Sequence, residues 1–252
     1  MLNEFTKARP NIFLTSFFRS GSTHIKESLL RILPGYRGET TVLSAGEIGN
    51  DNNGAISPFA AQLLFPKPAQ IFHQHTPGTC GNAILLKMYK VRPVIQMRNM
   101  LDSMISVVEL LRLGQPQHLG IYYPQNFHRW NEFDQLWWAV ANLPNWYFTF
   151  YLSWKYADVD KLIIWYDEYY KDQVAGLKSI ITHSQIEGTV TDEVLKMASE
   201  VIDPKLSRFK FGRPGRGREI LNGAMVEDVI DQAKLWKEGR ELIDNLVERG
   251  YD

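Results

Sequence analysis

Cysteine is nearly absent from this 252-residue chain, which has only Cys80. A single cysteine excludes a disulfide within the chain and fits a protein of a reducing compartment. The first residues, MLNEFTKARPN, also lack the apolar run of a secretory signal peptide. We therefore expect a cytoplasmic protein.

Long hydrophobic runs are missing as well, because no window approaches the ~20 apolar residues that a membrane-spanning helix needs. The nearest window, residues 136–152, contains Pro144 and two asparagines, and is better interpreted as buried helices on either side of a break. The charges balance, with 28 basic and 28 acidic residues. Nothing therefore draws the whole molecule to nucleic acid or to an anionic membrane, and any basic site has to be local.

Hydrophobic residues make up 44% of the chain, which is enough for a large core. Apolar runs rich in β-branched and aromatic residues predict strands at 12–18, 69–73, 93–97 and 161–166. Helical patterns lie between or after these runs, and the alternation indicates an α/β protein with a parallel sheet flanked by helices. Because the chain has no repeat and no low-complexity linker, we expect residues 1–252 to form a single domain.

Helices and loops follow from the spacing of apolar residues and from clusters of turn-forming residues. The first helix is expected to have Ser22 or Thr23 as its N-cap. Helical patterns occur at 25–33, 101–111, from 191–193 onward and at 225–249, and loops are expected at 49–58 and 114–128. In parallel sheets, ligands bind beyond the carboxyl ends of the strands, and every motif described below falls at such an end.

Residues 19–23, Arg-Ser-Gly-Ser-Thr, separate the first predicted strand from the first helix. Such a turn presents backbone N–H groups and the positive end of a helix dipole, which suit an anion. Gly21 lets the backbone close on the anion, Ser22 and Thr23 offer hydroxyls, and Arg19 adds a fixed charge. The chain lacks GxxxxGK[ST] here, which argues against an ordinary ATP or GTP loop. The alternative is a plain turn with a serine N-cap.

A second candidate anion site begins where the strand predicted at 93–97 ends. Arg98 follows this strand, and Ser106 lies eight residues later, about two helical turns away. Arg98 at the carboxyl end of a strand can meet a second anion. The alternative is structural, with Arg98 exposed and Asp102 only favouring the helix N-terminus.

Taken together, "FRSGST" (18–23) and "RNMLDSMIS" (98–106) resemble two motifs of sulfotransferases that use 3′-phosphoadenosine-5′-phosphosulfate, PAPS. Arg19 in place of the usual loop lysine is similar to the Arg-Ser-Gly-Ser/Thr loops of bacterial-type members. The resemblance implies a P-loop-like sulfotransferase fold. It also implies that residues Arg19, Ser20, Gly21, Ser22 and Thr23 bind the 5′-phosphosulfate. Arg98 and Ser106 would bind the 3′-phosphate, and His24 stands where a tryptophan often stacks on adenine.

Three further segments resemble motifs of the same family and occur in the same order. "FHQHTP" (72–77) places His75 at the position of the general base and His73 at that of a lysine beside it. "LIIWYDEYYKD" (162–172) places Tyr166 at the position of an adenine contact. "FGRPGRGREIL" (211–221) resembles the loop that closes over the 3′-phosphate, which implies roles for Arg213 and Gly215.

The resemblance therefore implies an enzyme that transfers a sulfuryl group from PAPS to a hydroxyl or amine and releases 3′-phosphoadenosine-5′-phosphate, PAP. His75, Arg19 and His73 are the expected catalytic residues. No metal is needed, although His73 and His75 share a strand face and could be taken for metal ligands. The acceptor could be a small molecule, a glycan or a lipid. An inactive nucleotide-binding relative and a kinase-like phosphotransferase are the alternatives, and nothing in the sequence indicates the oligomeric state.

The aromatic residues between 130 and 151 have two interpretations. Their density at helical spacing is typical of a buried core. They could instead line an acceptor pocket.

Overall fold

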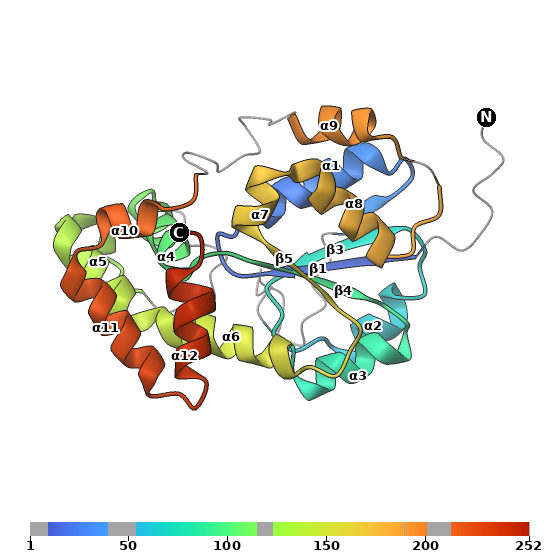
Figure 1. Ribbon diagram of the computed structural model, residues 1–252. Coiled ribbons are helices and arrows are strands. Elements are labelled where there is room, and N and C mark those ends of the chain that lie inside the picture. The colour runs from blue at the N-terminus through green and yellow to red at the C-terminus, as the bar shows by residue number, and fades with distance from the viewer. Residues whose placement is uncertain (1–9, 40–53, 115–122, 189, 201–212, 252) are drawn as a thin grey trace.

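The computed structural model describes residues 10–39, 54–114, 123–188, 190–200 and 213–251. At its centre lies a five-stranded sheet in the order β2-β3-β1-β4-β5, in which all neighbouring strands are parallel. The strands are Ile12–Ser16 (β1), Arg37–Glu39 (β2), Gln70–Gln74 (β3), Pro93–Met97 (β4) and Leu162–Trp165 (β5). Helices cover both faces of the sheet (Figure 1), so the predicted α/β class and parallel sheet are confirmed.

The four predicted strands are all present, and β2 is the strand that sequence reasoning missed. It is three residues long, Arg-Gly-Glu, and carries no apolar pattern. Its pairing with β3 is what makes it a strand. The prediction also extended β1 too far: Phe17 and Phe18 are buried but belong to the loop after Ser16.

The helices in chain order are Ser22–Ile32 (α1), Pro58–Leu64 (α2), Cys80–Met88 (α3), Met100–Arg112 (α4), Glu132–Asn142 (α5), Pro144–Tyr156 (α6), Tyr166–Lys171 (α7), Gln173–His183 (α8), Asp192–Glu200 (α9), Arg216–Ile220 (α10), Gly223–Lys234 (α11) and Gly239–Leu242 (α12). A 3₁₀ turn covers Phe127–Arg129, and a π-helical segment covers Ile243–Glu248. The expected break near residue 144 is confirmed: Pro144 begins α6, a position where its missing N–H costs nothing.

β1 lies between two hydrophobic cores, and its successive apolar side chains belong to one core and the other in turn. Ile12 and Leu14 join the core beneath α1, α8 and α9. Phe13 joins the larger core, which includes residues of α2 to α6 and of α11. Both faces of the strand are fully buried, as is usual for parallel sheets covered by helices.

One expectation about a helix was wrong: the residue before α1 is Gly21, in the left-handed conformation, and neither Ser22 nor Thr23 is the N-cap. The amphipathic pattern at 225–249 is divided between segments, because the chain leaves α11 after Lys234 and turns back at Gly239. A Cβ atom on Gly239 would lie 2.7 Å from the Ala233 carbonyl oxygen, so this close turn requires glycine.

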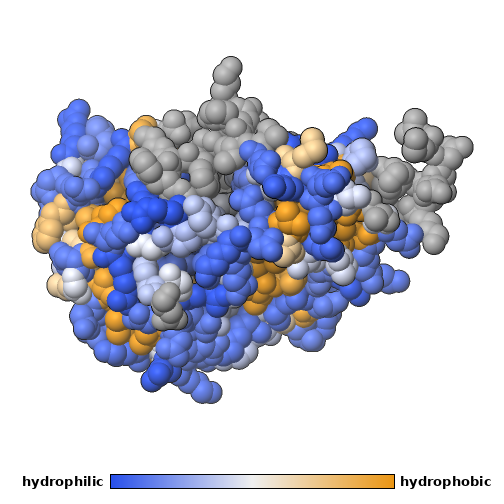
Figure 2. All heavy atoms as spheres, turned by 45° about the horizontal axis from the view of Figure 1, so that its top comes forward, coloured by the Kyte–Doolittle hydropathy of each residue, from blue (hydrophilic) through white to orange (hydrophobic). Residues whose placement is uncertain are grey.

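Parts of both predicted loops, 49–53 and 115–122, lie outside the described residues. Pro58, the last residue of the first predicted loop, is the first residue of α2. Within the described part of the chain, no helix has the length and apolar character to cross a membrane. Figure 2 shows the face that includes the top of Figure 1, where the surface is mostly hydrophilic with separate hydrophobic patches.

Candidate functional site

The loop between β1 and α1 is held tightly against the sheet. The Phe17 N–H donates to the Gln96 carbonyl at 3.0 Å, and the buried Ser20 hydroxyl donates to the Phe17 carbonyl at 3.0 Å. Gly21 has a φ of 86°, and a Cβ atom there would lie 2.6 Å from the Tyr166 ring. No described side chain caps α1, and an uncapped helix N-terminus is a place where an anion can bind.

A chain of hydrogen bonds links this loop to His73, which lies in β3, and to His75, which follows the end of β3. His75 Nδ1 lies 2.9 Å from the Ser16 carbonyl oxygen and 3.2 Å from the Ser16 hydroxyl. The Ser16 hydroxyl donates to Ser22 Oγ at 2.8 Å, and Ser22 Oγ lies 2.8 Å from His73 Nε2. Because a carbonyl only accepts, Nδ1 of His75 is the N–H donor and Nε2 carries the lone pair.

The Ser22 hydroxyl accepts from Ser16 and also shares a hydrogen bond with His73 Nε2. Burial lowers the pKa of His73 to about 3, and the nearby charges of His75 and Lys26 act in the same direction. His73 is therefore neutral near pH 7, and it supplies a hydrogen bond where a lysine would supply a charge.

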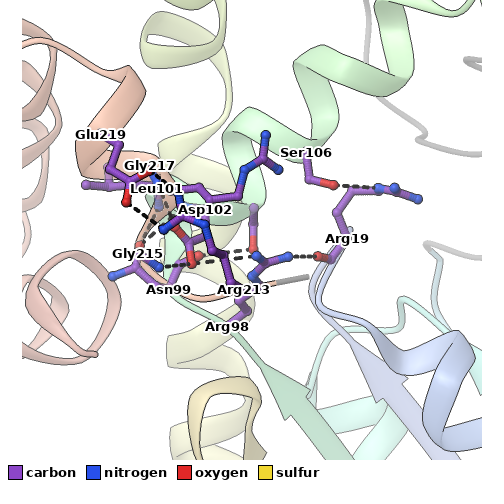
Figure 3. A network of polar contacts seen from close by, with 12 residues as sticks. Arg19, Arg98, Asn99, Leu101, Asp102, Ser106, Arg213, Gly215, Gly217 and Glu219 are labelled. Atoms are coloured by element: carbon purple, nitrogen blue, oxygen red, sulfur yellow. Dashed lines mark hydrogen bonds and ion pairs between the residues drawn. The ribbon is translucent and has the colours of Figure 1, made fainter. Parts of the chain in front are cut away.

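Arg98 joins the β1–α1 loop to α4 (Figure 3). Its guanidinium donates to the Arg19 carbonyl at 3.2 Å, lies 3.6 Å from the Asp102 carboxylate and sits 4.4 Å from the centre of the Tyr166 ring. Arg98 is only 6% exposed, so the alternative of an exposed arginine is wrong. Its buried Nε has no hydrogen-bond partner among the described residues, and such a donor fits an anion.

Arg19 crosses from the loop to α4 and brings the two predicted anion motifs together. Its Nε donates to Ser106 Oγ at 3.0 Å. Arg19 itself has a φ of 62°, a conformation that costs energy in residues other than glycine. A strained basic residue held between two anion motifs is typical of a functional site.

Asp102 contacts the segment predicted to close the site. Its carboxylate accepts from the Gly215 N–H at 3.0 Å and from the Gly217 N–H at 2.7 Å. A Cβ atom on Gly217 would lie 2.4 Å from that of Leu101, so the chain approaches α4 as closely as glycine allows. Asp102 therefore does more than favour the helix N-terminus.

The segment predicted to close the site is only partly described, since residues 211 and 212 lie outside the described part. Arg213 forms a two-point pair with Glu219 in which both side chains are more than half exposed. The structure thus places Gly215 against α4, whereas Arg213 faces its own short helix.

Tyr166 and His24 occupy different environments. Tyr166 begins α7 directly after β5, is 4% exposed, and burial raises the pKa of its hydroxyl to about 12. His24 bridges α7 and α9, with Nδ1 3.0 Å from the Tyr169 hydroxyl and Nε2 3.0 Å from the Ser199 carbonyl. Burial lowers the pKa of His24. Both ring nitrogens of His24 are therefore used in contacts between helices. Thr23, the residue before it, is exposed.

Three residues near this site were missed from the sequence. Ser16 positions His75, and its only signal was a polar residue at the end of an apolar run. Phe18 lies 4.6 Å from the His75 ring and stacks on Trp146 at 4.1 Å between ring centres. Gln96 is fully buried, and neither atom of its amide has a partner among the described residues.

Most of the aromatic residues between 130 and 151 are core residues. Buried members are Trp138, Tyr147, Phe148, Phe150 and Tyr151. Trp146 is partly buried and lies next to the site through Phe18. Among the described residues, no group of three or more histidine, cysteine or acidic side chains is arranged to hold a metal ion.

Comparison with known proteins gives matches of structure and none of sequence: no family model and no curated protein matches the chain. The mouse sulfotransferase SULT7A1 complexed with PAP is 19% identical, with a TM-score of 0.61, and the match covers 94% of this chain and 89% of that protein. Retinol dehydratase matches in two structures. The complex with androsterone and inactive cofactor PAP is 15% identical with a TM-score of 0.57, and the complex with retinol and PAP is 14% identical with a TM-score of 0.55; each match covers 94% of this chain and 82% of that protein. The chain therefore has the fold seen in the mouse sulfotransferase, as predicted.

Proposed function

We propose that this protein transfers the sulfuryl group of PAPS to a hydroxyl or amine of an acceptor and releases PAP. The observation that carries the proposal is the hydrogen bond from Arg19 Nε to Ser106 Oγ, 3.0 Å long. It joins the loop expected to bind the 5′-phosphosulfate to the helix expected to bind the 3′-phosphate. Structures that share the fold contain PAP, which supports the choice of nucleotide.

The residues present fit a nucleotide with anionic groups at both ends. At the 5′ end, Gly21 holds the left-handed turn of the loop against the Tyr166 ring, where a Cβ atom would clash, and α1 begins without a side-chain cap. At the 3′ end, the buried Nε of Arg98 is an N–H donor without a partner among the described residues. When bound, PAPS supplies the activated sulfuryl group.

His75 is the proposed general base. Its Nδ1–H is committed to the Ser16 carbonyl, so Nε2 holds the lone pair that can accept the proton of an acceptor hydroxyl. The network through Ser16 and Ser22 fixes the tautomer and the orientation of the ring. No step of this scheme requires a metal ion.

Positive charge for the leaving group comes from Arg19 and from the N-terminus of α1. His73 is neutral near pH 7 and holds the Ser22 hydroxyl, so we assign it a supporting role and not a charge-donating one. Fixed charge and oriented N–H groups act where negative charge develops during transfer. Phe18 packs beside the His75 ring and stacks on Trp146, and such apolar surroundings suit an acceptor with a flat or apolar body.

The test is calorimetry with PAP and with 5′-AMP, which lacks the 3′-phosphate. We expect tighter binding of PAP, and we expect Arg98→Ala to weaken it by about 1.5–3 kcal/mol, the range for a charge-assisted hydrogen bond. The affinity for 5′-AMP should change little. Equal affinity of the original protein for both nucleotides would remove the basis of the proposal.

A second candidate is a relative that binds the nucleotide without turnover. The observation that favours it is the neutral His73 at the position where the family has a lysine. Radiolabelled PAPS with a broad panel of hydroxyl and amine acceptors separates the two candidates. Consumption of PAPS with labelling of an acceptor supports transfer, whereas binding without consumption supports the second candidate.

A further inference from the structure

Residues 247–251 lie against the N-terminus of α4, far from it in sequence. Asn99 Nδ2 donates to the carbonyls of Val247 and Arg249, both at 2.9 Å. The Tyr251 hydroxyl lies 3.3 Å from Asn99 Oδ1 and 3.4 Å from Asp102 Oδ1. The segment is thus joined to α4 between Arg98 and Ser106, the two residues expected to bind the 3′-phosphate.

The same five residues contact the two other segments of this side of the site. Arg249 pairs with Asp167 at 3.2 Å and with Glu168, and its guanidinium lies 4.2 Å from the centre of the Trp165 ring. This junction of β5 and α7 carries Tyr166. The Tyr251 ring lies 4.9 Å from the guanidinium of Arg218 in α10, and Figure 1 shows the chain end between α10 and α7.

Two partners of this segment, Asn99 and Asp102, are buried polar side chains that also bond other parts of the chain. Asn99 Oδ1 also accepts from the Leu101 N–H at 2.9 Å, so this one side chain both caps α4 and holds 247–251. Asp102 is 1% exposed and accepts from Gly215 and Gly217. A buried carboxylate held by several donors keeps its position, and so do the groups that donate to it.

We propose that residues 247–251 form a clasp that holds α4, the 213–217 segment and Tyr166 in position for the 3′-phosphate of the nucleotide. Tyr251 is a positioning residue in this clasp and does not touch the nucleotide. The inference rests on the proposed function, which it deepens. It assigns recognition of the 3′-phosphate partly to residues outside every nucleotide motif.

The test uses Tyr251→Phe, which keeps the ring beside Arg218 and removes the hydroxyl. Tyr156→Phe is the matched control, because the Tyr156 hydroxyl also bonds a side-chain oxygen, that of Glu238, but on α6. Hydrogen exchange in the absence of nucleotide is measured first. We expect faster exchange of the Gly215 and Gly217 amides in Tyr251→Phe and no change in Tyr156→Phe. Unchanged exchange at both amides in Tyr251→Phe would overturn the clasp, whatever the protein binds.

Calorimetry then tests the link to the nucleotide. Tyr251→Phe should weaken PAP binding ~3- to 10-fold, the effect of one hydrogen bond, and leave 5′-AMP binding within about twofold. In assays of transfer, the KM for PAPS should rise while kcat stays within about twofold, because the groups around His75 are not altered. Equal losses for both nucleotides would show a general structural defect and refute the inference. If the original protein does not bind PAP more tightly than 5′-AMP, the proposed function fails. The exchange measurement contains no nucleotide, so it tests the clasp separately.

Discussion

The side of the site at β1 and β3 is held together by neutral groups, whereas the side at α4 is held together by charged ones. Around His75 the contacts run through two serines, a histidine and a carbonyl, and the residues come from the ends of β1 and β3 and from the start of α1. Around Arg98 they run through the Asp102 carboxylate and the Asn99 amide, whose partners lie up to 152 positions away in the chain. A directional neutral network suits proton transfer, and a charged cluster suits recognition of a phosphate.

This difference predicts that changes on the two sides have different consequences. Substitutions near His75 should lower turnover and spare nucleotide affinity. Substitutions near Arg98 should lower nucleotide affinity and spare turnover at saturating PAPS.

The largest effect is expected for His75→Ala. Loss of a general base lowers transfer by ~10²- to 10⁴-fold, while PAP affinity stays nearly unchanged. Single-turnover assays with saturating acceptor measure the first and calorimetry the second. His128→Ala, which changes an exposed histidine, is the control. Near-normal transfer by His75→Ala would move the base to another residue.

Arg19→Ala should lower kcat by about 10²-fold, the loss typical of one group that stabilises developing charge. PAP affinity should fall much less, because Arg19 meets charge that grows during transfer. Both alanine and arginine are strained at the φ of 62° found here, so the backbone conformation does not confound the comparison. If only the KM for PAPS rises, Arg19 is a ground-state binding residue.

Gly21→Ala should destabilise the protein by about 1–3 kcal/mol, because the residue combines a positive φ with a contact to Tyr166. It should also weaken PAP binding, since the loop cannot keep its shape. Gly81→Ala is the matched control: a Cβ atom at Gly81 meets nothing within 4 Å. Urea unfolding measures both variants. Equal stability of Gly21→Ala and the original protein would contradict the assigned strain.

His73 should make stability depend on pH. Its pKa is about 3 in the folded protein and ~6.5 when unfolded, so the unfolded chain binds more protons between these values. Stability is therefore retained above pH ~6.5 and falls by about 1 kcal/mol per pH unit as the pH drops below it. His73→Gln removes this contribution, so urea unfolding at pH 7 and pH 5 should show a smaller fall for the variant. An identical fall in both proteins would mean that His73 is not neutral in the fold.

The parts of the structure that could be predicted from the sequence are those with local causes. Apolar runs of strand length indicated β1, β3, β4 and β5, and the Arg-Ser-Gly-Ser-Thr turn followed the first of them. Because parallel strands place their carboxyl ends at one edge, the sequence also predicted that Arg19, His75 and Arg98 lie close together. Strand propensity, turn formation and helix spacing act over a few residues and can be recognised in them.

Only the tertiary structure determined the burial and the charge of these residues and the contacts that hold them in place. The sequence did not distinguish a buried Arg98 from an exposed one, nor a neutral His73 from a charged one, because both depend on what packs around the side chain. The amphipathic pattern at 225–249 did not indicate that the chain turns back at Gly239, nor that the segment that follows joins Asn99 and Asp102. Contacts across 150 positions arise from packing of the whole chain, and no local preference of the residues records them.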